Sequence, residues 1–228
     1  MAGIATHLII AREIIKLLPE GALADEGLFI AGSIAPDAIH AREGFVRADK
    51  KHTHLRDDIP DKDFILQCNI ELFHQRVADF ILKNWQRKDG LLDLYRGYVV
   101  HLLTDELYML TIRQEFVNRM EKEGINQSDK DFFIRIVTDM NRNDFLLAVN
   151  YADKDEIRKR LEQVKPYQIE GMLSEDELTR SRNWVIKRYF YDRIDLFEPV
   201  YISYDRTQEF VKMASEEIVR RLSKEGNL

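Results

Sequence analysis

A histidine and an aspartate stand four residues apart in the apolar stretch GYVVHLLTDELYML, residues 97–110. At helical spacing, His101 and Asp105 lie one turn apart on one face, which they share with apolar residues such as Leu94 and Tyr98. A buried charge without a partner is costly, so this pair requires either a hydrogen-bonded core environment or a bound cation. The cation is an alternative because two ligands one turn apart can bind the same metal ion.

Further imidazole and carboxylate groups occur upstream of this pair. His7 shares a helical face with apolar residues, Asp37 follows the segment GSIAP, and His54 lies in a polar segment two residues after His52. Each alone has an ordinary interpretation: a core histidine, a carboxylate in a Pro-Asp turn, or a solvated surface histidine. Together they are explained at once by a metal site, because imidazole nitrogens and carboxylate oxygens suit zinc and similar divalent ions. For the other two histidines, His40 and His74, the sequence offers no support as ligands.

Several established motifs are absent. The chain has no H-E-x-x-H, no paired C-x-x-C and no EF-hand loop. No histidine is directly followed by aspartate, which argues against an HD-type phosphohydrolase. Cys68 is the only cysteine, so an intrachain disulfide and a thiolate cluster are both excluded. We expect Cys68 to be a small core residue.

The elements that must position these residues have helical periodicity almost throughout. Residues 38–62 have no clear period and are predicted to form a long irregular loop of the kind that is commonly functional. Capping boxes are expected at Ser128 with Asp131 and at Ser174 with Glu177. No strand pattern is present, so the predicted fold class is all-α. The helices are expected at about residues 4–18, 25–35, 63–86, 91–121, 129–150, 153–164, 174–190 and 205–224.

Length and composition favour one domain. A chain of 228 residues can bury one large core, and we predict a single domain over residues 1–228. Its metal-site core is expected in residues 1–122 and a C-terminal helical extension in residues 123–228. The net charge of −6, without a Lys/Arg block, disfavours a stable nucleic-acid partner and attraction to anionic membranes. We expect no signal peptide, no transmembrane segment and a cytoplasmic location.

The order of the candidate residues resembles that of the zinc-dependent phospholipase C family, which is all-helical and related in architecture to the S1/P1-type nucleases. A histidine in the first helix, GSIAPD, Thr-His-Leu in a loop and GYVVHLLTDELY follow one another over residues 1 to about 110. The resemblance implies a multi-helix fold of that type and four ligands of one zinc ion: Asp37, His54, His101 and Asp105.

The resemblance also implies roles beyond this first ion. Asp105 would bridge to a second ion held by His7, and Asp37 would orient or deprotonate the attacking water as the catalytic residue. His52 is the alternative to His54 for the loop ligand, because the two are nearly interchangeable in sequence. The predicted function is therefore hydrolysis of a phosphoester, either a small molecule or a lipid headgroup.

The chain departs from the family pattern in two respects. Secreted members use the α-amino group of a processed N-terminal Trp, whereas here Met1 lies six residues before His7. They also have a downstream set of two histidines and a glutamate, whereas no histidine follows His101. We therefore expect one or two ions of zinc or another divalent metal. Two alternatives are a non-catalytic, metal-stabilised helical interaction domain and a single-strand nuclease of related architecture.

Overall fold

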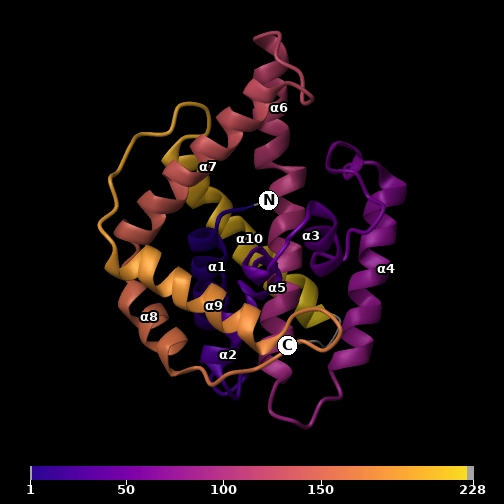
Figure 1. Ribbon diagram of the computed structural model, residues 1–228, viewed down its shortest axis with the longest axis vertical. Coiled ribbons are helices and arrows are strands. Elements are labelled where there is room, and N and C mark those ends of the chain that lie inside the picture. Colours follow the sequence, from indigo (N-terminus) through magenta and orange to yellow (C-terminus); the bar gives the residue numbers. More distant parts are fainter. Residues whose placement is uncertain (1, 225–228) are drawn as a thin grey trace.

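The computed structural model describes residues 2–224, which form helices and the segments that join them (Figure 1). Within these residues no strand occurs, and one isolated bridge joins Ile169 to Leu173. The predicted all-α class is therefore confirmed for the described part of the chain. The elements are α1 (Ile4–Leu17), α2 (Glu26–Gly32), η1 (Ala35–Ala41), α3 (Arg47–Thr53), η2 (Asp61–Asp63), α4 (Gln67–Asn84), α5 (Leu92–Leu110), α6 (Ile112–Lys122), α7 (Lys130–Asn150), α8 (Lys154–Gln163), α9 (Glu175–Ile186), η3 (Lys187–Tyr191) and α10 (Tyr204–Lys224).

Helix α5 runs through the middle of the molecule (Figure 1). Nearly all of its residues are buried, including the polar Thr104 and Glu106, and it packs against α1, α2, α4 and α10. A helix that is apolar on most sides is stable only when other elements surround it. The central helix of the fold is therefore the one that contains the His101–Asp105 pair.

Helices α2 and α5 approach so closely that only glycine fits at their contact. A Cβ added at Gly97 would lie 2.0 Å from the Phe29 carbonyl oxygen, and one at Gly32 would lie 2.1 Å from the Leu94 carbonyl oxygen. The sequence position of Gly97, one turn before His101, predicts close approach of another backbone or of a substrate. The approach of α2 confirms the first of these.

The expected element boundaries differ from the structure where short helices occur. The long irregular loop predicted for residues 38–62 is wrong, because η1, α3 and η2 lie within or overlap this segment. These helices span one or two turns, which is too short for a hydrophobic period to be visible. The helix predicted for residues 25–35 ends at Gly32, and the 3₁₀ helix η1 begins anew with Pro36 in its first turn.

Longer helices also end earlier than expected. The helix predicted for residues 91–121 is divided into α5 and α6 at Thr111, whose backbone is not helical (φ −121°, ψ −85°). The helix predicted for residues 174–190 is α-helical only to Ile186, and a π-helical segment, η3, follows. Neither break is marked by glycine or proline in the sequence, so both depend on tertiary packing.

Two local predictions are wrong and one is confirmed. The Ser174–Glu177 capping box is present at the start of α9. The predicted Ser128 box is absent, because α7 begins after Asp129, whose carboxylate instead accepts a hydrogen bond from the Asn126 backbone nitrogen. Cys68 is exposed at the start of α4 rather than buried in the core, since the buried face of that helix begins at Phe73.

One hydrophobic core extends over both halves of the described chain. Helices α7 and α10 pack against α1, and α9 packs against η1, so elements after residue 122 cover elements that contain the candidate ligands. No helix in residues 2–224 is long and apolar enough to cross a membrane.

Candidate metal centre

Five candidate ligands meet in the core. The first and last of them, His7 and Asp105, are far apart in the sequence. They come from four places in the fold: the middle of α1, the first turn of η1, the residue that caps the C-terminus of α3, and α5. Four of the side chains are at most 4% exposed, and Asp37 is 12% exposed. The five are His7, Asp37, His54, His101 and Asp105, and we call them the five-residue cluster.

The Nε2 atom of His54 lies at the centre of the cluster. It is 3.2 Å from His101 Nε2, 3.4 Å from Asp37 Oδ1 and 3.7 Å from Asp105 Oδ2. An oxygen of each carboxylate therefore lies within 4 Å of the same imidazole nitrogen. On the other side of Asp105, Oδ1 lies 3.4 Å from His7 Nε2, and the His7 and His101 rings are stacked 3.8 Å apart.

The donor atoms form two overlapping groups in which all members lie within 4.8 Å of one another. One group contains His7, His101 and Asp105, and the other contains Asp37, His54 and His101. His101 belongs to both, while Asp105 directs one oxygen toward His7 and the other toward His54. The arrangement can hold one or two cations.

Hydrogen bonds on the outer side of two rings determine which nitrogen faces the cluster. His101 Nδ1 donates to the Ser33 carbonyl oxygen at 2.7 Å, so its lone pair is on Nε2. The Thr53 hydroxyl donates its one proton to a backbone carbonyl such as that of Pro36, at 3.0 Å, and lies 3.1 Å from His54 Nδ1. In the tautomer in which His54 Nδ1 donates to Thr53, the lone pair of a neutral His54 is on Nε2. The two Nε2 atoms lie 3.2 Å apart, so a cation bound by both stabilises this tautomer, whereas in the other tautomer His54 Nε2 itself donates a hydrogen bond.

Other buried atoms of the cluster lack hydrogen-bond partners among the described residues. Neither nitrogen of His7 has one, and Asp105 Oδ2 has none. Buried polar atoms are almost always paired in folded proteins, so atoms left over in one place indicate a missing partner. Nitrogen and oxygen donors from neutral imidazoles and carboxylates are the set that zinc prefers. The residues present therefore fit a zinc ion.

The protonation states also suit a metal. Burial lowers the pKa of His54, and burial together with the neighbouring His7 ring holds the pKa of His101 well below its ordinary value. Burial alone would raise the pKa of both carboxyls. The Lys50 cation nevertheless holds the pKa of Asp37 well below its usual range, and the nearby His7 ring does the same for Asp105. Metal ligands must be neutral imidazoles and ionised carboxylates, which are the states that result.

Sequence reasoning missed a lysine at the edge of the cluster. Lys50 lies one turn before His54, and its Nζ donates to Asp37 Oδ1 at 2.6 Å and lies 3.2 Å from His40 Nε2. Because residues 47–53 were predicted to be part of a loop, the sequence did not indicate that Lys50, and not the adjacent Lys51, faces the cluster. The Lys50 side chain is 12% exposed and that of His40 is 52% exposed, so the cluster reaches solvent at this edge.

A buried aspartate that the sequence also failed to indicate holds the start of α1 in place. Asp144 on α7 accepts hydrogen bonds from the backbone nitrogens of Ala5 and Thr6 at 3.0 and 2.9 Å and from the Tyr189 hydroxyl at 2.8 Å. The residue before α1, Gly3, has no side chain to cap the helix, so Asp144 satisfies these donors instead. The contact spans more than 130 residues of sequence, and no local pattern signals it.

Two further histidines lie outside the cluster. His52, the sequence alternative to His54, has a 54% exposed side chain and lies 3.0 Å from Asp57 through Nδ1. His74 on α4 is 47% exposed and pairs with the buried Glu106 at 2.8 Å. The structure thus brings His54, and not His52, to the other four residues.

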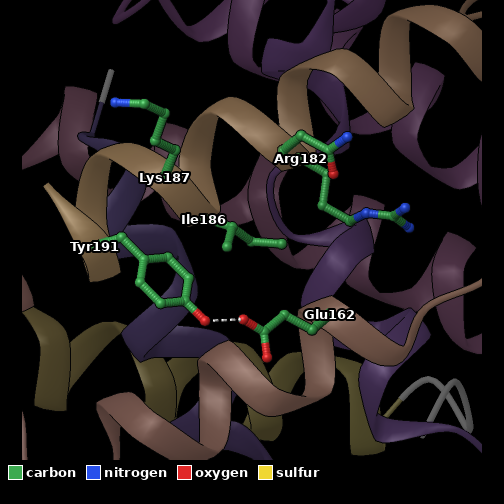
Figure 2. Close-up of a pocket in the computed structure, with 6 residues that line it drawn as sticks. Glu162, Arg182, Ile186, Lys187 and Tyr191 are labelled. Carbon is green, nitrogen blue, oxygen red and sulfur yellow. Dashed lines mark hydrogen bonds between the residues drawn. The ribbon is translucent and has the colours of Figure 1, made fainter.

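A separate surface hollow lies between α8, α9 and η3 (Figure 2). Its volume is about 300 Å³, and the Tyr191 hydroxyl donates across it to Glu162 at 2.6 Å. No member of the five-residue cluster lines it. The hollow is therefore distinct from the candidate metal centre.

Comparison with protein-family models found no match, and neither the curated proteins nor the solved structures yielded a similar chain. The functional interpretation therefore depends on the residues of the cluster and on their geometry.

Proposed function

We propose that this protein is a zinc-dependent phosphoester hydrolase whose metal ligands are the five-residue cluster. The observation that carries the proposal is the convergence of two imidazole nitrogens, His54 Nε2 and His101 Nε2, which lie 3.2 Å apart in the core. Two carboxylate oxygens, one from Asp37 and one from Asp105, lie within 4 Å of His54 Nε2. Lys50 compensates the charge of Asp37, but Asp105 Oδ2 and both nitrogens of His7 are buried without a hydrogen-bond partner among the described residues, which is costly unless a cation binds there.

The ligands divide between two positions. Asp37, His54 and His101 would hold the first ion together with Asp105 Oδ2. His7 would hold a second ion with Asp105 Oδ1, which supports the bridging role expected for Asp105. A zinc ion supplies Lewis-acid activation of a phosphoryl oxygen and of water when it is bound in such a site.

The solvent exposure of each cluster side chain indicates its role in hydrolysis. Asp37 is the cluster carboxylate that reaches solvent, so it can accept a hydrogen bond from the water that attacks phosphorus and orient that water. The side chains of His7 and His101 are fully buried, so bulk water does not reach these two ligands. The hydrogen bond from His101 to Ser33 fixes the ring against rotation, which keeps the ligand nitrogen in place.

The test measures metal content and hydrolysis on the same preparation. Wild-type protein purified without chelator should contain zinc and should hydrolyse p-nitrophenyl phosphate or bis(p-nitrophenyl) phosphate, with loss of activity on chelation and recovery with zinc. His101→Ala should lose both zinc and activity. His74→Ala is the matched control, because His74 is outside the cluster, and it should retain both.

Two outcomes would contradict the proposal. Absence of zinc from the wild-type protein, even after incubation with the metal, would rule out the metal centre. Stoichiometric zinc without hydrolysis of any phosphoester, including single-stranded DNA, would favour the metal-stabilised, non-catalytic domain. The low exposure of four ligands is the observation that favours this second candidate, since structural zinc sites are closed to solvent.

A further inference from the structure

The edge of the candidate metal centre that faces solvent contains a lysine side chain, Lys50. Four of the five side chains of the centre are at most 4% exposed, and the edge that reaches solvent consists of Asp37, Lys50 and His40. Lys50 uses its ammonium group to contact Asp37 Oδ1 at 2.6 Å and His40 Nε2 at 3.2 Å. An ammonium group has three donors, so one remains for an incoming ligand.

The charge of the loaded centre also indicates an anionic ligand. Metal ligands bind as ionised carboxylates and neutral imidazoles, so with one divalent ion Asp37 and Asp105 neutralise the metal and the single charge of Lys50 is left. With divalent ions at both of the positions proposed above, the excess rises to three positive charges. A phosphodiester contributes one negative charge, whereas a phosphomonoester contributes nearly two at neutral pH.

We infer that the substrate is a phosphomonoester, and that Lys50 binds a terminal oxygen of its phosphate group at the Asp37 edge of the centre. Lysine binds phosphate as a point charge, and the contact to Asp37 and His40 holds the ammonium at the place where the phosphate must enter. A headgroup with a quaternary ammonium, such as phosphocholine, would be repelled by the same charge. This inference rests on the proposed function and narrows its substrate class.

The experiment compares two phosphate probes on the zinc-loaded protein. Inorganic phosphate carries the charge of a monoester, and dimethyl phosphate carries that of a diester. Calorimetric titration should show that inorganic phosphate binds at least about tenfold more tightly. Lys50→Gln should weaken inorganic phosphate about tenfold while zinc content stays at the wild-type level, and Lys50→Arg should retain most of the affinity. Lys51→Gln is the control, since it removes the same charge from the next residue of α3, which has no side-chain contact with the cluster in the described chain.

The outcomes separate this inference from the proposed function. Zinc binding with equal affinity for the two probes, or with unchanged phosphate affinity in Lys50→Gln, would overturn the phosphomonoester inference and leave the metal centre intact. Absence of zinc would overturn both. The comparison of probes on wild-type protein decides the matter even if Lys50→Gln does not fold. Hydrolysis of soluble p-nitrophenyl phosphate against phosphatidic acid in vesicles then distinguishes a small-molecule from a lipid source of the monoester.

Discussion

At the scale of single residues, the two oxygens of Asp105 have different surroundings. Oδ1 accepts a hydrogen bond from the Ala2 backbone nitrogen at 2.8 Å and lies 3.4 Å from His7. Oδ2 has no hydrogen-bond partner within residues 2–224 and lies 3.7 Å from His54 and 3.8 Å from His101. A carboxylate with one oxygen directed to each side can bridge two ions, and a neutral amide at the same position bridges poorly.

Asp105→Asn should therefore lose more zinc than His7→Ala. The amide weakens both metal positions, whereas removal of the His7 ring affects only the second position and leaves the first. Zinc per protein, measured by mass spectrometry after dialysis against metal-free buffer, should rank wild type above His7→Ala and His7→Ala above Asp105→Asn. Hydrolysis of the phosphoester should follow the same order. Equal zinc in wild type and Asp105→Asn would show that this aspartate is a structural core residue.

The candidate site was predictable where ligands lie on long helices. His7, His101 and Asp105 are on α1 and α5, whose apolar period placed them inward. The remaining residues depend on short elements. The sequence could not separate His54 from His52, because the one-residue offset that buries one and exposes the other is set by the end of α3.

At the scale of elements, the site depends on how closely α2 and α5 pack. Ser33 follows α2 directly and accepts the hydrogen bond from His101, so a change in the separation of the two helices moves the His101 ring. The glycines at the contact, Gly32 and Gly97, permit the approach because a Cβ at either would overlap backbone atoms. Sequence analysis could predict that some group approaches Gly97, but not that the group is α2.

Gly97→Ala should separate the helices and weaken the site. The added methyl would meet the Phe29 carbonyl at 2.0 Å, and overpacking of this kind costs about 1–3 kcal/mol of the free energy of unfolding. Zinc affinity should fall as well, because His101 loses its fixed orientation. Gly27→Ala is the control on α2, since its Cβ meets no atom closer than 3.1 Å, and it should be milder in both urea unfolding and zinc titration. Equal effects of the two substitutions would contradict this account.

The position of His7 also depends on the hydrogen bonds that Asp144 accepts at the start of α1. Asp144→Asn should destabilise the protein by about 1–3 kcal/mol, because an amide cannot accept all of the hydrogen bonds from Ala5, Thr6 and Tyr189. It should also reduce zinc content, since α1 carries His7. Asp139, another buried aspartate of α7, accepts from the backbone nitrogens of residues 200–202, away from the cluster. Asp139→Asn should therefore lower thermal stability without loss of zinc, and a loss of zinc in both variants would contradict a specific role for Asp144.

At the scale of the whole molecule, the ligands and their support come from opposite parts of the chain. The five-residue cluster lies before residue 106, whereas α7, α9 and α10 cover the elements that carry it. The all-α class and most long helices follow from periodicity. The way that the second half covers the first does not, because the contacts that decide it, such as Asp144 with Ala5, join residues with no local relation.

The burial of the cluster histidines predicts how the stability of the metal-free protein responds to pH. The pKa values of His54 and His101 are lowered in the folded state, whereas in the unfolded chain they return to about 6.5. Below pH ~6.5 the unfolded state therefore binds more protons, and the free energy of unfolding decreases as the pH falls, by up to about 1.4 kcal/mol per pH unit for each histidine. The lowered pKa of Asp37 and Asp105 extends this loss below pH ~4.

Urea unfolding of chelated protein between pH 7.5 and 5.5 measures the effect. Protein saturated with zinc should be more stable at pH 7.5 and should retain that stability until protons displace the metal, because a bound ion keeps the imidazoles unprotonated. His74→Ala should leave the pH profile of the metal-free protein unchanged, since His74 is half exposed and lies outside the cluster. A free energy of unfolding that is the same at both ends of this range in the chelated protein would show that the cluster histidines are not held neutral by burial, and the argument for neutral imidazole ligands at the centre would then fail.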